Sequence, residues 1–475
     1  MRQGWNLITM KTTKSKKLIS FALFFFVACF YLGATPAFSI SLEEESIAGK
    51  KFLESMRRQF TFVGDDFAND YINKLGRYLI RPLETKYFPF HFYIIKNNEL
   101  NAFAGPGGYI FVFSGMVDAM DSADELAGVL CHEIGHVSAR HLAKRIEQYK
   151  KIALATIVGM LAGALLGGKP GSAIATGSVA AGIQKQLSYS REDERQADEL
   201  GFKYLDASGF NPEGMVDILK KLQKREWLGG SNVPPYLLTH PGGAERISNI
   251  EIMMRHYVPR SENRQTAKFR KDFPLLKTIL RAKCMDPDEA KRLFSLDLQK
   301  DPGSPLAHFG LGIIWKQRAE YGKAIDNFKK ALLTKPTCLP ILRELGEAYQ
   351  LQGEDQDAIQ VLRKALEVDA QDKGTLFLLG TSYQNLEQYD KAIRIYERLI
   401  SMKPVKNEVY YNLGLSYGRQ GKLALAHYYF GIYFKRQGER AKARFHFEKA
   451  QELAGNDQSL KMRIRSQMKK TRSRP

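Results

Sequence analysis

The stretch VLCHEIGHVSARH, from Val129 to His141, places two histidines four residues apart, with a glutamate directly after the first. On a helix, His132 and His136 project from the same face about one turn apart, so both rings can bind one metal ion. Glu133 then lies beside the metal rather than on it, which suits a general base that takes a proton from water. A catalytic zinc normally has three protein ligands, so a third ligand is expected elsewhere in the chain.

The third ligand is not expected from the same helix. In the metzincin pattern a third histidine would fall at position 142, which is Leu142, and His141 would point away from the other two on one continuous helix. The stretch LSYSREDERQADELGFKYL (187–205) is the better candidate, because Glu194 and Asp198 share one helix face. Glu194 could complete a His-His-Glu zinc set. Asp198 could hydrogen-bond a ligand histidine or act on the substrate amine, and a solvated charged helix is the alternative for both.

The residues before the HExxH stretch predict a small sheet that leads into a long helix. FHFYIIK (90–96) and the alternating run Tyr109–Phe113 read as short strands, with a Pro-Gly-Gly turn before the second. One helix is expected over 122–151, where Ser122 as N-cap and Glu125 three residues later form a capping box.

An apolar segment follows at 152–183, in which Lys169 is the only charged residue. Its first uninterrupted piece barely reaches the length of a membrane span, and GGKPG breaks it. A helical hairpin that is buried or covers the site is therefore favoured. A transmembrane helix and a lid that touches the membrane are the alternatives.

A strict repeat of 34 residues begins near residue 286. Small residues recur where paired helices touch and large residues recur between them, which is the tetratricopeptide pattern. The recurring small residues are Gly312, Gly346, Gly380 and Gly414, and Ala324, Ala358, Ala392 and Ala426. The large residues in register are Phe328, Leu362, Tyr396 and Phe430. A further unit around Phe447 is out of phase by half a repeat, so the helix before it could serve two units. The repeats predict a stacked helical surface that binds partners.

Charge and targeting patterns suggest where the chain acts. The formal net charge is +20, but no nucleic-acid fold signature accompanies it, so nucleic acid is not expected as a partner. Lysines followed by the apolar run Leu18–Leu32 and small residues near Ser39 predict a secretory signal and a periplasmic protein. An uncleaved anchor is the alternative. The basic C-terminus (459–475) is expected to be a frayed tail.

Three motifs together resemble peptidase family M48, a family of zinc metallopeptidases. They are NAFAGPGGYIFVFSG, DELAGVLCHEIGHVSARH and SREDERQAD, in family order over most of residues 95–205. The resemblance implies one zinc per chain bound by His132, His136 and Glu194, with Glu133 catalytic and Asp198 as the supporting acid. LLTHPGGAERI is similar to the Thr-His-Pro loop of the family. His240 could approach the zinc there as a reversible fourth ligand or a transition-state donor, and a packing histidine is the alternative.

The sequence also suggests a substrate class. The strand Tyr109–Phe113, with Tyr109 and Phe111 in it and Asn101 and Phe103 leading into it, could bind an extended substrate by edge pairing. Unfolded or stalled chains would then be the substrates. An exported M48-like domain followed by these repeats is similar to bacterial proteases of outer-membrane assembly, which implies that the repeats dock assembly machinery. An adaptor or chaperone with a dormant protease is the alternative.

These patterns predict an α-rich α+β zincin domain with a small sheet, followed by an all-helical tetratricopeptide superhelix. The expected divisions are a signal peptide (1–39), a metallopeptidase domain (40–265), a repeat domain (266–458) and a basic tail (459–475). Contact of the apolar hairpin with a membrane surface stays open.

Overall fold

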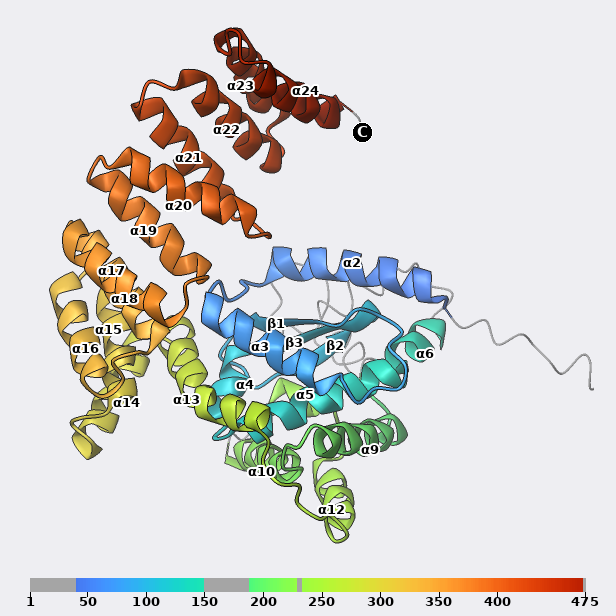
Figure 1. Ribbon diagram of the computed structural model, residues 1–475. Helices are drawn as coiled ribbons and strands as arrows, with labels where there is room; N and C mark the ends of the chain where they lie inside the picture. Colours follow the sequence, from blue (N-terminus) through green and yellow to red (C-terminus); the bar gives the residue numbers. More distant parts are fainter. Residues whose placement is uncertain (1–39, 149–187, 229–232, 473–475) are drawn as a thin grey trace, which may run out of the picture.

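The computed structural model of the chain describes residues 40–148, 188–228 and 233–472 (Figure 1). They form an N-terminal lobe of helices around a small sheet, and an arc of paired helices that curves away from it. The predicted class, an α-rich α+β domain followed by an all-helical superhelix, is confirmed. The predicted signal peptide (1–39) and the apolar hairpin (152–183) lie outside the described residues.

The sheet has three strands, β1 (His91–Ile95), β2 (Ala102–Gly105) and β3 (Tyr109–Phe113), in the order β1-β3-β2. β3 runs parallel to β1 and antiparallel to β2. The short 3-10 turn Pro106–Gly108 joins β2 to β3, and both of its glycines have positive φ, which glycine adopts without strain.

The helices of the N-terminal lobe cover both faces of this sheet (Figure 1). One face packs on α2 through a cluster around Phe52 and Phe111, and the other faces the core that includes α3 and α5. In chain order the helices are α2 (Leu42–Gln59), α3 (Asp66–Leu79), α4 (Ser114–Ala119), α5 (Ala123–Ser138), α6 (His141–Gln148), α9 (Arg191–Ala207), α10 (Glu213–Leu228), α11 (Pro235–Thr239) and α12 (Gly243–Met254).

The expectation that Tyr109–Phe113 is an edge strand is wrong. β3 is the central strand, so both of its edges already pair with β1 and β2. The outer edge of β1 is partly closed by a bridge between Ile95 and Phe62, which leaves β2 as the strand at the other edge. Sequence alternation identified the strand, but strand order depends on pairings that the alternation does not encode.

The single long helix expected over 122–151 is two helices, which is a second correction. Ser122 caps α5 as predicted and accepts a hydrogen bond from the Glu125 backbone, but the Glu125 carboxylate accepts from the Asp121 N–H instead of completing a capping box. α5 ends at Ser138, and Arg140 takes a left-handed conformation with φ of 53° before α6 begins. This break changes the direction in which the following residues point.

Helix α13 (Arg264–Cys284) joins the two lobes, because Phe273 belongs to the core of the N-terminal lobe and Ile279 to the core of the repeats. At this junction the Lys283 ammonium lies 2.7 Å from the Asp65 carboxylate of the N-terminal lobe and 2.8 Å from Glu344 of the repeats. Burial raises the pKa of Glu344, but Lys316 and Lys283 together lower it to about 2. The predicted domain boundary near residue 265, between the metallopeptidase domain and the repeat domain, stays a prediction.

The repeat arc consists of antiparallel helix pairs that stack through the predicted small and large residues. Its helices are α14 (Pro287–Lys300), α15 (Pro305–Gln317), α16 (Tyr321–Thr334), α17 (Leu339–Gln352), α18 (Asp355–Val368), α19 (Lys373–Asn385), α20 (Tyr389–Ser401), α21 (Asn407–Arg419), α22 (Leu423–Arg436), α23 (Arg440–Leu453) and α24 (Gln458–Arg472).

Each repeated glycine lies directly under the large side chain of the paired helix. The four pairs are Gly312 with Phe328, Gly346 with Leu362, Gly380 with Tyr396 and Gly414 with Phe430. α22 serves two units, as predicted, because its Phe430 packs on Gly414 of α21 and its Gly431 receives Phe447 of α23.

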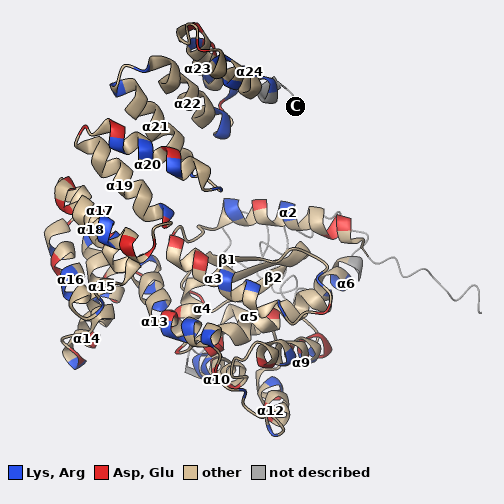
Figure 2. Ribbon diagram, in the orientation of Figure 1, with Lys and Arg blue, Asp and Glu red and all other residues tan. Residues whose placement is uncertain are grey.

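The basic C-terminus does not fray as expected. It forms α24 as far as Arg472, and Leu460 and Ile464 of this helix are buried in the core of the repeats. Apolar residues at a spacing of four place one face of the helix against the superhelix. Figure 2 shows lysines and arginines spread over both lobes among acidic residues.

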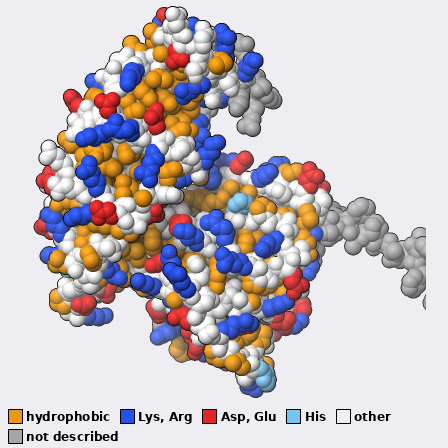
Figure 3. All heavy atoms as spheres, in the orientation of Figure 1, with side chains coloured by type: hydrophobic (Ala, Val, Ile, Leu, Met, Phe, Trp, Pro, Cys, Tyr) orange, Lys and Arg blue, Asp and Glu red, His pale blue; other side chains and the backbone are white. Residues whose placement is uncertain are grey.

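A cleft of about 840 Å³ lies where α3 and α13 face the repeat arc, and Figure 3 shows the surface hollowed between the two lobes. Side chains of both charges line it, among them Asp66, Lys74, Arg343 and Lys406. Among the described residues, no helix combines the length and apolar character needed to cross a bilayer.

Replacing Gly380 by alanine tests the packing of the repeats. The added Cβ would lie 2.7 Å from Cε1 of the fully buried Tyr396, so we expect a loss of about 1–3 kcal/mol in the free energy of unfolding, measured in urea. In the control Gly322→Ala no described atom lies within 4 Å of the added Cβ, so stability should stay the same or rise by up to about 1 kcal/mol. Equal effects of the two substitutions would contradict this packing.

Candidate functional site

Two helices approach each other unusually closely at the centre of the N-terminal lobe. A Cβ on Gly135 of α5 would lie 2.7 Å from the Ala197 carbonyl oxygen of α9, and one on Gly201 would lie 3.1 Å from the His132 backbone nitrogen. These positions therefore need glycine for the two helices to touch through their backbones. The contact places the predicted ligands of α5 opposite those of α9, and the capping box of Ser190 and Asp193 begins α9 just before Glu194.

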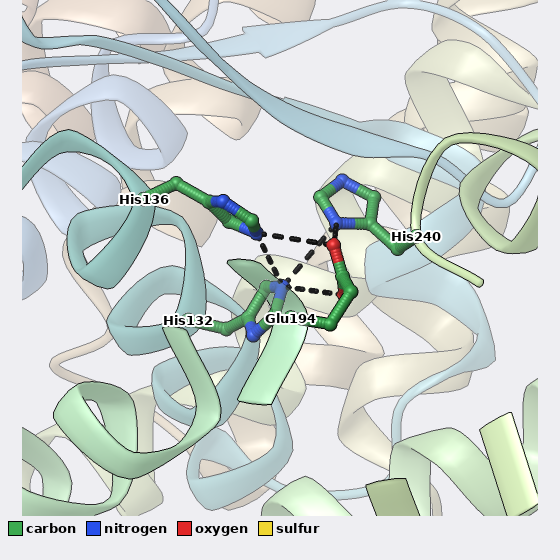
Figure 4. Close-up of side chains that lie close together, drawn as sticks. All are labelled: His132, His136, Glu194 and His240. Carbon is green, nitrogen blue, oxygen red and sulfur yellow. Dashed lines mark hydrogen bonds and ion pairs between the residues drawn. The ribbon is translucent and has the colours of Figure 1, made fainter. Parts of the chain in front are cut away.

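The structure brings four potential metal ligands together: His132 and His136 from α5, Glu194 from α9, and His240 after α11 (Figure 4). Their ligand atoms all lie within 4.8 Å of one another, and each of the four residues is at most 1% exposed. The His136 and His132 Nε2 atoms are 3.0 Å apart, and each lies 3.4 Å from a Glu194 carboxylate oxygen. His240 Nδ1 is 3.1 Å from Glu194 and 3.3 Å from His132 Nε2.

These separations fit a tetrahedral metal ion. Ligand atoms at about 2.0–2.1 Å from a zinc ion lie about 3.3 Å from one another in a tetrahedron. Five of the six separations, which lie between 3.0 and 3.4 Å and involve both Glu194 oxygens, are close to that value. The ligand atoms of His136 and His240 lie within 4.8 Å of each other. The chemistry of the donor set, three imidazoles and one carboxylate, also suits zinc.

Glu133 lies next to this group and is fully buried. Among the described residues neither of its carboxylate oxygens has a hydrogen-bond partner, and the His240 Nε2 lies 3.6 Å from Oε1. A buried carboxylate without partners is costly unless a further group binds there. A water or substrate amide between Glu133 and the four ligands would satisfy it.

Asp198 and Arg246 lie behind the ligands. Asp198 Oδ1 is 2.8 Å from His132 Nδ1, which supports the prediction that Asp198 orients this ring. Arg246 of α12 donates to both Asp198 oxygens at 2.8 Å, and its Nη1 lies 2.9 Å from Glu194. Arg246 was not among the predicted site residues. The sequence feature that could have indicated a buried arginine is its position one residue before Ile247 and four before Ile250, on the buried face of an amphipathic helix.

The pKa shifts follow from this network. Burial raises the pKa of Asp198, but Arg246 and His132 lower it to about 2. Burial also raises the pKa of Glu194, which His240 and Arg246 bring well below its usual value. Burial lowers the pKa of His136 well below its usual range, which favours the neutral imidazole that a metal ligand requires.

His132 is the exception in this site. Burial and Arg246 lower its pKa, but Asp198 and Glu194 raise it to about 9. A metal ion would have to displace that proton, so metal uptake should release protons.

Aromatic rings pack around the ligands. Tyr236 stacks on His240 with ring centroids 4.4 Å apart, and Tyr189 stacks on His136 at 3.8 Å. The Tyr189 backbone N–H also donates to the Thr239 carbonyl at 2.9 Å. This bond joins the residues just before α9 to the residue just before His240. His240 is therefore held in the site by its neighbours and does not project from a turn.

The four predicted substrate-binding residues are all buried around the sheet: Asn101, Phe103, Tyr109 and Phe111. Phe111 and Tyr109 belong to the central strand, and with Phe103 they form the cluster under α2, so core packing accounts for all three. Asn101 differs, because among the described residues neither atom of its side-chain amide has a hydrogen-bond partner. Ala104 and Gly105 at the β2 edge line a small pocket with His136 and Tyr189.

Comparison with known proteins agrees with this site. The sequence profile described as peptidase family M48 matches residues 66–254, and tetratricopeptide profiles match 341–374 and 377–433. The beta-barrel assembly-enhancing protease of Yersinia pestis is 35% identical over 221 residues, which are 46% of this chain and 45% of that protein, so the match spans about half of its length. The protein of the same name from Escherichia coli K12 is 31% identical over 353 residues, 70% of this chain and 69% of its own. Among solved structures, MamA matches at 26% identity with a TM-score of 0.31, covering 38% of this chain and 99% of MamA.

Replacing Arg246 by methionine tests the buried charge network. It removes the guanidinium that both Asp198 and Glu194 contact and leaves them only histidine partners, so the free energy of unfolding of the metal-free protein should fall by about 3–5 kcal/mol, measured in urea. Saturating zinc should recover part of this loss, because its charge would pair with the carboxylates.

The matched control is Arg191→Met, which breaks an exposed ion pair with Glu245 between the same two helices and should cost about 1 kcal/mol or less. Equal losses for the two variants would contradict the role given to Arg246.

Proposed function

The chain belongs to peptidase family M48, and on this premise we propose that it is a zinc-dependent endopeptidase that binds one zinc ion per chain. The observation that carries the proposal is the buried group His132, His136, Glu194 and His240. Beside it lies the Glu133 carboxylate, which has no hydrogen-bond partner in the part of the chain that the structure describes. Three buried carboxylates at this site, on Glu133, Glu194 and Asp198, face one buried guanidinium, so a divalent cation would balance the charge.

Each residue then has a definite task in peptide hydrolysis. When bound, zinc would supply a Lewis acid that activates water and polarises the peptide carbonyl. Glu133 takes the proton of the attacking water and returns it to the leaving amine. Asp198 is a positioning residue, because both of its oxygens already bind His132 and Arg246, which leaves it no free oxygen for the substrate amine.

The edge of β2 is the proposed substrate strand site. An extended peptide can add to the edge of a sheet through backbone hydrogen bonds, and Ala104 and Gly105 lie beside His136 at this edge. Asn101 precedes the same strand, and among the described residues its buried amide has no hydrogen-bond partner, so a substrate backbone that reaches it could bind it. Only extended backbone can pair in this way, so unfolded or stalled polypeptides are the proposed substrates.

The cellular role is proposed from the relatives and the repeats. The relatives from Yersinia pestis and Escherichia coli are named beta-barrel assembly-enhancing protease, and we propose that this chain acts in the periplasm, where it would degrade stalled outer-membrane proteins. The repeats would dock the outer-membrane assembly machinery, and the cleft between the lobes offers charges of both signs for such contacts. Contact of the segment 152–183 with a membrane surface belongs to the same proposal.

A second candidate function rests on the closed state of the site. With His240 as a fourth ligand the set would be complete, as in zinc sites without an open position. In this state the chain would act as a tetratricopeptide adaptor or chaperone for outer-membrane assembly, with an autoinhibited protease. The two candidates differ in whether loss of Glu133 abolishes the cellular function.

Replacing Glu133 by glutamine tests the peptidase directly. Glu133 is outside the ligand group, so the purified variant should hold as much zinc as the unmodified protein. Digestion of an unfolded test protein should fall by about 10²–10⁴-fold, because the general base is lost. If both proteins bind zinc and neither cleaves the test protein, the adaptor function is favoured. If the unmodified protein binds no zinc, the proposed metal site is wrong.

Replacing His240 by alanine tests whether this residue closes the site. As a fourth ligand it competes with water and substrate, so its removal should raise the rate of peptide cleavage by about tenfold or more if the closed state dominates. Zinc affinity should fall at the same time, because one of four ligands is lost. A lower kcat with unchanged zinc affinity would instead make His240 a donor in the transition state.

A further inference from the structure

His141 contacts a ligand histidine, although a continuous helix would have pointed it away. Its ring is buried, and its Nδ1 lies 2.9 Å from Nδ1 of His136. Its Nε2 lies 2.9 Å from the Gln196 side-chain oxygen and 3.5 Å from the Asp193 carboxylate, both on α9. His141 therefore joins the helix that carries the HExxH stretch to the helix that carries Glu194.

The atoms around His141 determine where its hydrogen lies. Both oxygens near Nε2 are acceptors, so Nε2 carries the hydrogen and the neutral ring offers an acceptor at Nδ1. His136 Nδ1–H then donates to His141 Nδ1, and the lone pair of His136 Nε2 points into the ligand group. One chain of hydrogen bonds, from His136 through His141 to Gln196, thus selects the tautomer that a metal ligand needs.

The break between α5 and α6 makes this contact possible. Arg140 adopts φ of 53° at the break, and its guanidinium donates to the buried carboxylate of Glu45 at 2.9 Å and to the Ile40 carbonyl at 2.7 Å. α2 therefore stabilises the break between α5 and α6. His141, the first residue of α6, can then contact His136. A left-handed arginine is unfavourable by itself and persists because these contacts hold it.

We propose that His141 is a positioning residue for the zinc ligand His136, and that it does for this ring what Asp198 does for His132. The proposal rests on the proposed function, because it assumes that His136 binds zinc. The two ligand histidines then have different partners behind them, a neutral imidazole for His136 and a carboxylate for His132. Partners of this kind fix ring orientation and are worth a measurable share of metal affinity.

Two substitutions separate positioning from packing. His141→Asn keeps an oxygen where Nδ1 stood, so it can still accept from His136. His141→Gln keeps polar atoms near Gln196 but none at the Nδ1 position, although its size is closer to that of histidine. Lys144→Ala, at an exposed position of the same helix, is the control.

The measurement is the zinc affinity of the full chain by competition with a chromophoric chelator, with the thermal midpoint of each metal-free protein recorded beside it. We expect zinc affinity to fall by about 10–100-fold in His141→Gln and to stay within about threefold of the unmodified protein in His141→Asn and Lys144→Ala. The midpoints of the metal-free proteins should be similar.

Two results would overturn the proposal: zinc bound by His141→Gln as tightly as by the unmodified protein, or equal losses in both His141 variants that follow a drop in the metal-free midpoint. The second result would make His141 a packing residue. If the unmodified protein binds no zinc, the proposed function itself fails, which is distinct from a failure of this inference.

Discussion

The close contact between α5 and α9 is the constraint on which the site depends. Gly135 and Gly201 let the two helices touch through their backbones, and a side chain at either position would force them apart. This contact sets the distance between the histidines of α5 and Glu194 of α9, and so decides whether one ion can reach all of them. The small sheet and α2 on one side, and α10 and α12 on the other, hold the pair in place.

Buried charge is the second condition that the fold has to satisfy. Three carboxylates are buried at the site, and of the described buried side chains around them Arg246 alone carries a permanent positive charge. Such an arrangement is costly in a low-dielectric interior unless further positive charge is present. In the metal-free protein the raised pKa of His132 keeps this ring protonated, which provides part of that positive charge. A divalent ion would supply it in the loaded protein, so the same side chains that hold the metal also make the fold depend on it.

Much of this could be predicted from local patterns. The HExxH spacing and the pair Glu194 and Asp198 are periodicities of one helix, the 34-residue repeat is the period of one helix pair, and the structure places these residues as expected. What could not be predicted depends on contacts between distant segments. Arg140 breaks the helix because α2 holds it, and β3 is central because β2 folds back on it. Arg246 pairs with Asp198 from 48 residues away. Sequence periodicity carries no information on such contacts.

The X-ray absorption spectrum of the purified protein at the zinc edge tests the central claim most directly, because it reports the ligands without requiring activity. We expect stoichiometric zinc in a single shell of nitrogen and oxygen at about 2.0–2.1 Å, with scattering from three imidazole rings. Absence of zinc, a sulfur ligand, or fewer than two imidazoles in the shell would contradict it.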